Sequence, residues 1–208
     1  MPLFKTINLN IDTKILVWKI TETFDELSIE TILNQNSKTR LQNMKSQLHQ
    51  RGFLSVRKML TIAGYTDFDL HYDQSGKPHL SDKKFISISH SHQFATLIIS
   101  NKPVGIDIEL LKPKTLKIAQ RFMDILHLEN LSETETIKKA TIIWGIKETV
   151  FKIKNEKGIS FPDHIFENEF ALSDKKTTAQ LRFNNKVKNF DIFFEEIDDY
   201  VLVWGFLV

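Results

Sequence analysis

The chain has 208 residues, of which 41% are hydrophobic, an ordinary share for a globular protein with one sizeable core or two half-domains that share one. Lysine and arginine total 28 against 26 acidic residues, and this net charge of +2 is too balanced to indicate general nucleic-acid binding. The absence of cysteine excludes disulfides, thiolate catalysis and any zinc or iron–sulfur site with cysteine ligands.

Membrane and secretory signals are also missing from the sequence. No run approaches the roughly 18 consecutive apolar residues of a membrane span. The opening residues, Met1 to Lys5, lack the charged start and apolar core of a secretory signal. We therefore expect a cytoplasmic protein that binds neither a membrane nor nucleic acid.

The first half of the chain mixes strand and helix patterns. In chain order it predicts a strand at residues 15–20, one long helix at 37–64, an extended segment at 68–72, a turn at 73–76 and a hairpin with strands at 85–89 and 94–99. The helix prediction rests on apolar residues at roughly helical spacing, which continue until Gly64 offers a stop signal.

The second half repeats this order of elements. It predicts a strand that begins at residue 103, a helix at about 115–128, a second helix from 132 to about 156, and closing strands at 190–194 and 200–208. Ser132 and Glu135 have the spacing of a capping box for the second helix. The repeated order predicts an α+β fold of two similar half-domains, residues 1–102 and 103–208, although residue identity between them is weak.

Two acidic residues stand out on the strand after Pro103. Asp107 and Glu109 are two residues apart and therefore point to the same face of a strand, among Ile106, Ile108 and Leu110. Burying carboxylates is costly unless a cation compensates them, and a divalent metal ion is the obvious candidate. Alternatively, the two acids are sheet-edge charges that discourage aggregation.

The helix from residue 132 carries a second charged pair. Trp144, Glu148 and Lys152 are successive i, i+4 neighbours on one stripe. A core-facing stripe is predicted from Ile137, Ala140 or Thr141, Trp144 and Phe151, and Glu148 continues its line. A carboxylate on such a stripe needs a partner. The alternative is an ordinary surface pair of Glu148 and Lys152, worth about 0.3–0.5 kcal/mol.

Other motifs narrow the class of site. The seven glycines are scattered, and no Gly-x-Gly-x-x-Gly or Walker-type run occurs, which disfavours Rossmann and P-loop folds. No His-Glu-x-x-His run occurs either, so a zinc protease is disfavoured. Lysine and arginine cluster without an acid between residues 112 and 121, a pattern that is also typical of a solvated face.

Taken together, these segments resemble a known family. Gly105-Ile106-Asp107-Ile108-Glu109 and Trp144-x-x-Lys147-Glu148-x-x-x-Lys152 resemble the two signature motifs of the 4′-phosphopantetheinyl transferase superfamily. Gly76-Lys77-Pro78 and Ile88-Ser89-His90 look like upstream motifs of its Sfp-type group, and the similarity spans residues 50 to 162. The first fifty residues match poorly, and Thr149 stands where the family usually has a smaller residue.

The resemblance implies a fold and a reaction. Sfp-type enzymes are single-chain pseudo-dimers of two α+β halves with the active site between them, so we expect an intramolecular pseudo-dimer that acts as a monomer. The reaction is attack by a serine hydroxyl of an apo acyl or peptidyl carrier protein on the β-phosphate of coenzyme A. It leaves phosphopantetheine on the serine and releases 3′,5′-ADP.

The resemblance also assigns roles to residues of this chain. Asp107, Glu109 and Glu148 would bind Mg²⁺, or Mn²⁺ in its place, and Glu148 would serve as general base directly or through a metal-bound water. Lys152 would offset phosphate charge or protonate the leaving group, and Lys147 would assist less directly. The residues implied to hold coenzyme A are Arg51, Lys77, Ser89 and His90, together with Lys152.

Partners and competing functions complete the expectations. The basic run 112–121 and the segment of about 155–170 are the candidate surfaces for an acidic carrier protein. Two other functions remain open at this point: a catalytically silent module that binds coenzyme A or a carrier protein, and an unrelated metal-dependent phosphohydrolase.

Overall fold

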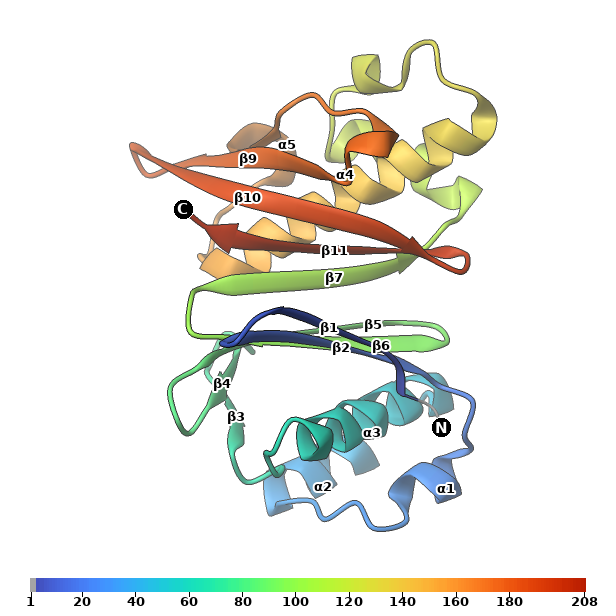
Figure 1. Ribbon diagram of the computed structural model, residues 1–208, viewed down its shortest axis with the longest axis vertical. Coiled ribbons are helices and arrows are strands. Elements are labelled where there is room, and N and C mark those ends of the chain that lie inside the picture. Colours follow the sequence, from blue (N-terminus) through green and yellow to red (C-terminus); the bar gives the residue numbers. More distant parts are fainter. Residues whose placement is uncertain (1–2) are drawn as a thin grey trace. The chain divides into compact units, whose positions relative to one another are not determined.

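A computed structural model describes residues 3–208, so the first two residues of the opening segment lie outside it. Helices and strands are mixed throughout, which confirms the α+β class. The chain divides into two compact units, one up to residue 101 and the other from residue 102 onward, each with its own sheet (Figure 1). Among residues 3–208, no helix has both the length and the apolar character needed to span a membrane.

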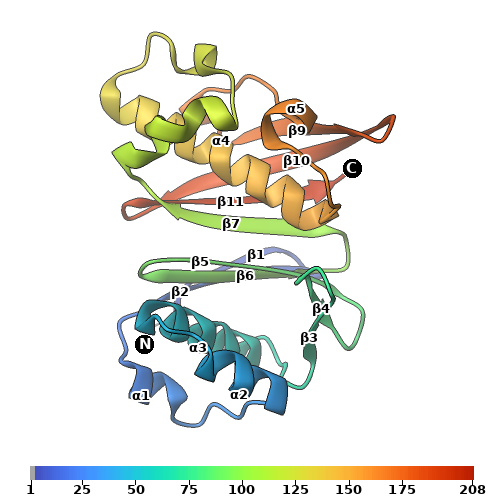
Figure 2. The ribbon, with the colours of Figure 1, turned by 180° about the vertical axis from the view of Figure 1, so that it is seen from behind.

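The first unit is an antiparallel sheet with helices on one face. Its strand order is β1-β2-β6-β5, and the bounds are Leu3–Asn10, Thr13–Lys19, Phe94–Ser100 and Phe85–Ser91 in that order. The covering helices are α1 (Phe24–Ser28), α2 (Gln35–Gln42) and α3 (Gln47–Ile62) (Figure 2). A separate hairpin, β3 (Leu70–Tyr72) and β4 (Pro78–Leu80), follows α3. The core lies between α3 and the sheet and includes Leu54, Leu60 and Leu97.

The predicted long helix at 37–64 is wrong, because the segment forms two helices. Asn34 caps α2 through a bond from the Ser37 N–H to its side-chain oxygen, and α2 ends at Gln42 with Asn43 as its C-cap. The next helix begins only after Ser46. Asparagine and serine favour caps and turns over helix interiors, which explains the interruption. Strand β1 was not predicted, because it is largely exposed and lacks a continuous apolar pattern.

The second unit packs one long helix on a five-stranded antiparallel sheet. The strand order is β7-β11-β10-β9-β8, with bounds Val104–Leu110, Tyr200–Leu207, Lys186–Ile197, Lys176–Phe183 and Ile165–Glu167 in that order. Helix α4 (Glu133–Lys154) packs on β7 and β11 (Figure 2). The short helices are α5 (Phe161–His164) and 3₁₀ turns at Pro113–Arg121, Ile125–Leu128 and Leu172–Asp174.

Helix α4 confirms its predicted start and, in part, its predicted core stripe, since Ala140 is buried in the core and Trp144 and Phe151 pack against it. The Ser132 hydroxyl accepts a bond from the Glu135 N–H, and the Glu135 carboxylate accepts one from the Ser132 N–H, which completes the capping box. Trp144 and Phe151 are only half-buried, whereas Ile143, Ile146 and Val150, which lie outside the predicted stripe, are fully buried. The helix is buried over most of its surface, so a one-sided stripe describes it poorly.

The predicted helix at 115–128 is also wrong. Two 3₁₀ segments form in its place, with a break at residues 122–124. Pro113 fixes the entry of the first segment, and Lys114, Lys117 and Arg121 place like charges three or four residues apart. Asp124 caps the second segment by accepting a bond from the Leu126 N–H.

Candidate functional site

The acidic strand places its charged side chains toward α4. A Cβ built on Gly105 would overlap the carbonyl oxygen of Thr149, so the face of β7 that carries Gly105 faces the helix. Asp107 and Glu109 follow on that face by the two-residue alternation of a strand. Asp107 is only 3% exposed, and Glu109 is half-buried. The predicted shared face of the two acids is therefore present beneath a helix.

Three glycines allow α4 to approach the sheet this closely. Gly105 on β7 lies opposite Gly205 on β11. A Cβ on Gly145 of α4 would stand 2.6 Å from Cγ2 of Val203 on β11, and one on Gly205 would stand 3.3 Å from Cγ2 of Thr149 on the helix. Such distances are tighter than ordinary Cβ contacts, so a side chain at either position would force its neighbour to shift. Sequence reasoning missed Gly145 and Gly205, because nothing in the local sequence marks a close approach between distant elements.

The close approach brings a lysine of the helix onto the acidic strand. Lys152 Nζ lies 2.6 Å from Asp107 Oδ1 and 3.0 Å from the carbonyl oxygen of Ile106, and it donates to both. The Asp107 side chain is 4% exposed and the Lys152 side chain 25%. Lys152 is thus hydrogen-bonded to β7, so it is not only a surface i, i+4 partner of Glu148.

Glu148 shares this charged region. The pKa of Glu148 is raised to about 7, chiefly by burial and also by the negative charges of Asp107 and Glu109, whereas Lys152 acts in the opposite direction. A carboxyl group in this range exchanges its proton near neutral pH. Glu148 therefore lies within electrostatic reach of Asp107, Glu109 and Lys152.

The donor set fits a hard divalent cation. Asp107, Glu109 and Glu148 supply only carboxylate oxygens, which Mg²⁺ prefers, and the negative charges of Asp107 and Glu109 help to raise the pKa of the half-buried Glu148, as expected where acids gather without a cation. No group of three or more His, Cys, Asp or Glu side chains within residues 3–208 is already arranged around one point. Mg²⁺ is usually held by one or two carboxylates with waters and substrate phosphates, so a complete protein cage is not required.

Lys147 lies in a different environment from Lys152. It is 2% exposed, it forms an ion pair with Glu167 of β8, and it donates to the carbonyl oxygen of Ile165. Burial lowers its pKa, and the charge of Glu167 opposes that shift. Lys147 therefore joins α4 to β8, and its neighbour in the motif, Glu148, is the member that belongs to the acidic region.

Arg51 and His90 lie around the first turns of α3. Arg51 donates from Nε to the carbonyl oxygen of Glu22 and from Nη2 to that of Ile20, at 2.7 and 3.0 Å. The His90 ring lies over Gly52, where a Cβ would stand 3.2 Å from its Cγ. Arg51 thus has a structural anchoring role, and its predicted contact with coenzyme A stays a prediction.

Lys77 and Ser89 come from two other segments of the same unit. Lys77 is half-buried at the end of the turn before β4, and Ser89 is buried on β5. The coenzyme A residues predicted outside α4 therefore all belong to the first unit, whereas the predicted metal ligands and Lys152 belong to the second. A single site that combines the two sets stays a prediction.

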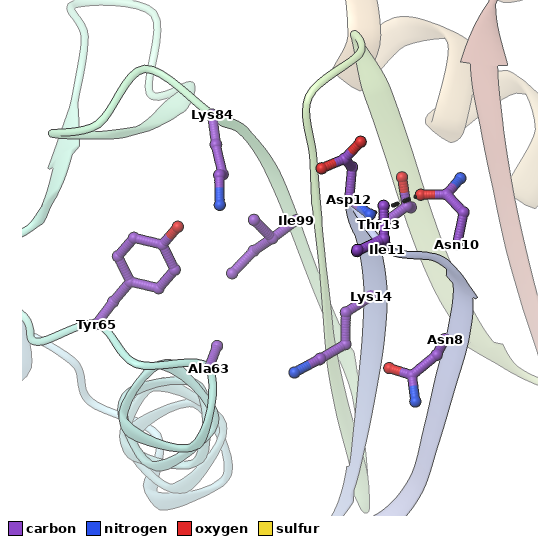
Figure 3. Close-up of a pocket in the computed structure, with 10 residues that line it drawn as sticks. All are labelled: Asn8, Asn10, Ile11, Asp12, Thr13, Lys14, Ala63, Tyr65, Lys84 and Ile99. Carbon is purple, nitrogen blue, oxygen red and sulfur yellow. Dashed lines mark hydrogen bonds between the residues drawn. The ribbon is translucent and has the colours of Figure 1, made fainter.

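A cavity of about 620 Å³ in the first unit contains none of the predicted site residues. Figure 3 shows the side chains of Lys14, Lys84 and Tyr65 around it, with Ile99 between them. Its charges offset one another, because Asp12 lines the cavity and Lys84 lies 4.0 Å from Asp82. The cavity therefore shows no preference for an anion or a cation.

Comparison with known proteins agrees with the chemistry of the second unit. Residues 103–204 match the model of the 4′-phosphopantetheinyl transferase superfamily. Relatives include the 4′-phosphopantetheinyl transferase gsp of Aneurinibacillus migulanus, 29% identical over 60% of this chain and 52% of its own length. A 4′-phosphopantetheinyl transferase of Bacillus subtilis is 36% identical over 42% and 41% of the two chains. The 4′-phosphopantetheinyl transferase Sfp of Bacillus subtilis strain 168 is 30% identical over 47% and 45%.

The matches have a limited extent, since the chain spans about half the length of these curated relatives or somewhat less. The family match covers β7, α4 and most of β11, which are the elements that carry Asp107, Glu109, Glu148 and Lys152. The chain therefore belongs to the 4′-phosphopantetheinyl transferase superfamily, and its relatives support the Sfp type within it.

Proposed function

We propose that this protein transfers 4′-phosphopantetheine from coenzyme A to a serine of an apo acyl or peptidyl carrier protein. The observation that carries the proposal is the contact of Lys152 with Asp107 beside Glu148, inside the region that matches the family. The names of the relatives support the same activity. The proposal includes a monomer that acts in the cytoplasm without nucleic acid or membrane.

The bond changes require one proton acceptor and one site of charge neutralisation. The serine oxygen bonds to the β-phosphorus of coenzyme A, and the bond from that phosphorus to the bridging oxygen breaks and releases 3′,5′-ADP. Glu148 takes the serine proton, for which a pKa of about 7 is well matched. Lys152 neutralises charge on the leaving phosphate or gives it a proton, and Asp107 holds the Lys152 ammonium in place.

A divalent ion completes the proposed site. Asp107, Glu109 and Glu148 would hold Mg²⁺, or Mn²⁺ in its place, which would offset the negative charge of the pyrophosphate. Phosphoryl transfer depends mainly on positioning and charge neutralisation, so the protein need not form a covalent intermediate. We assign Arg51, Lys77, Ser89 and His90 to the phosphates and nucleotide of coenzyme A.

The test combines the protein with coenzyme A, Mg²⁺ and a panel of apo carrier proteins, and follows the intact mass of each carrier. We expect at least one carrier to gain one phosphopantetheine group and 3′,5′-ADP to appear in equal amount. Excess chelator should stop the reaction, and added Mg²⁺ should restore it. If coenzyme A binds but no carrier gains mass, the protein is a binding module; if coenzyme A does not bind, the proposal fails altogether.

A further inference from the structure

The turn between β3 and β4 is unusually well defined for an exposed segment. Strands β3 and β4 pair Tyr72 with Pro78, which leaves Asp73 to Lys77 as the connection. The Asp73 N–H donates to the carbonyl oxygen of Lys77 at 3.0 Å, and the Gly76 N–H donates to that of Asp73 at 3.0 Å. Gly76 has a φ of +83°, which glycine adopts without strain. Two backbone hydrogen bonds therefore span this turn.

The Asp73 carboxylate forms the centre of the turn. Its Oδ1 accepts bonds from the Ser75 N–H at 2.9 Å, the Ser75 hydroxyl at 2.6 Å and the Lys77 N–H at 3.0 Å. Its Oδ2 lies 3.1 Å from Nε2 of His79 on β4. The bonds from Ser75, then that from His79, hold the pKa of Asp73 well below its usual range. An ionised carboxylate thus fixes residues 75, 77 and 79 together.

Asp73 fixes the backbone at Lys77, a residue that we assign to the binding of coenzyme A. Lysine has a long side chain, and ordering it on binding costs conformational entropy. A rigid backbone at Lys77 does not remove this side-chain cost. It does mean that binding need not also order the backbone of the turn. Two of the bonds that close the turn end on Lys77 itself, one at its N–H and one at its carbonyl oxygen.

We propose that Asp73 is a positioning residue for coenzyme A, acting through Lys77, and that His79 supports its second oxygen. This inference rests on the proposed function, because that proposal assigns Lys77 to the coenzyme A phosphates. Asp73 itself touches no substrate: it fixes the turn from which the Lys77 side chain reaches the phosphate. Its loss should weaken coenzyme A binding and leave the chemical step almost unchanged.

The test is a double-mutant cycle with Asp73→Ala and Lys77→Ala, read by calorimetric binding of coenzyme A and by kcat and KM in carrier modification. We expect Asp73→Ala to raise Kd and KM for coenzyme A about tenfold, with kcat within about twofold of wild type. Asp73→Asn keeps an acceptor oxygen for the turn and should restore most of the affinity. The double variant should bind like Lys77→Ala alone, since one residue acts through the other.

Asp69→Ala is the matched control. Asp69 is a half-buried carboxylate beside this hairpin, and it accepts bonds from the Thr66 N–H and the Ser81 hydroxyl. It should leave Kd and KM for coenzyme A unchanged. Equal effects of Asp69→Ala and Asp73→Ala, or fully additive effects of Asp73→Ala and Lys77→Ala, would overturn the inference. Failure of the proposed function is distinct, because wild type would then modify no carrier while the binding cycle remains measurable.

Discussion

Asp107 has two partners to satisfy, the Lys152 ammonium and the proposed cation. In Asp107→Asn the side chain keeps its shape but loses the charge that both partners need. We expect carrier modification to fall at least about 100-fold. The free energy of unfolding should fall by about 1–3 kcal/mol, because Lys152 loses a charged acceptor at a nearly buried position. Carrier mass and urea unfolding measure the two effects, and the exposed Asp12→Asn is the control for the same chemical change.

The raised pKa of Glu148 predicts that the stability of the metal-free protein depends on pH. Its pKa rises from 4.5 to about 7 on folding, so the folded protein binds more protons than the unfolded chain between these values. Stability therefore falls as the pH rises through this window, by at most about 3 kcal/mol, since the group is partly solvated. Urea unfolding with chelator at pH 5 and pH 7 should show this loss in wild type, and Glu148→Gln should reduce it. Equal pH slopes in the two proteins would contradict the assignment.

Local rules predicted only part of the site at this scale. The shared face of Asp107 and Glu109 follows from strand alternation, and the stripe through Glu148 and Lys152 follows from helix spacing. The contact between Lys152 and Asp107 joins residues 45 positions apart, and no local spacing rule reaches that far. Likewise, the bonds of Arg51 to Ile20 and Glu22 depend on tertiary packing that a single sequence does not show.

At the scale of elements, the distance between α4 and the sheet decides whether the charged groups meet. Gly105→Ala would place a Cβ against the Thr149 carbonyl, which belongs to the helix backbone and cannot turn away. We expect a loss of about 1–3 kcal/mol in unfolding free energy and reduced transfer, because α4 must shift away from β7.

Gly145→Ala provides the comparison. Its new Cβ would meet mainly the side chain of Val203, and alanine gains up to about 1 kcal/mol of helix propensity over glycine. The loss in Gly145→Ala should therefore be smaller, and Val203→Ala in the same chain should recover part of it. Thermal or urea unfolding measures all three variants. A larger loss in Gly145→Ala than in Gly105→Ala would show that the helix backbone yields more easily than this packing implies.

Some elements were predictable and others were not, for identifiable reasons. The hairpin of β5 and β6 has clear alternation, and α4 has a capping box and a long apolar pattern. The segment Pro113–Arg121 has helical spacing too, but its repelling charges and its entry proline leave it as a 3₁₀ turn. Strands β8 and β9 carry mixed polar side chains, and their partners in the sheet define them more than their own pattern does.

At the scale of the whole molecule, the two units carry different parts of the proposed reaction. The second unit holds the acids and Lys152, and it contains the region matched by the superfamily. The first unit holds Arg51, Lys77, Ser89 and His90. The α+β class follows from element order alone, whereas the pseudo-dimer relation of the two units stays a prediction, because weak residue identity between the halves gives no position-by-position correspondence.

Recognition of the carrier protein can be tested at the basic 3₁₀ segment. Lys114 and Lys117 are exposed on Pro113–Arg121, and carrier domains of acidic character would meet them with complementary charge. The double variant Lys114→Glu/Lys117→Glu should raise KM for an acidic carrier about tenfold at low salt and leave KM for coenzyme A unchanged. The effect should shrink in 0.5 M salt, where the Debye length falls to about 4 Å.

Lys38→Glu/Lys45→Glu is the control for this charge reversal, because both lysines are exposed in the first unit and the net charge changes by the same amount. If the general charge of the protein governed the encounter, the two double variants would behave alike. A specific surface predicts a large KM effect for Lys114→Glu/Lys117→Glu alone. Equal effects would therefore mean that the basic segment is an ordinary solvated face. The other predicted surface, at about residues 155–170, would then be the next to test.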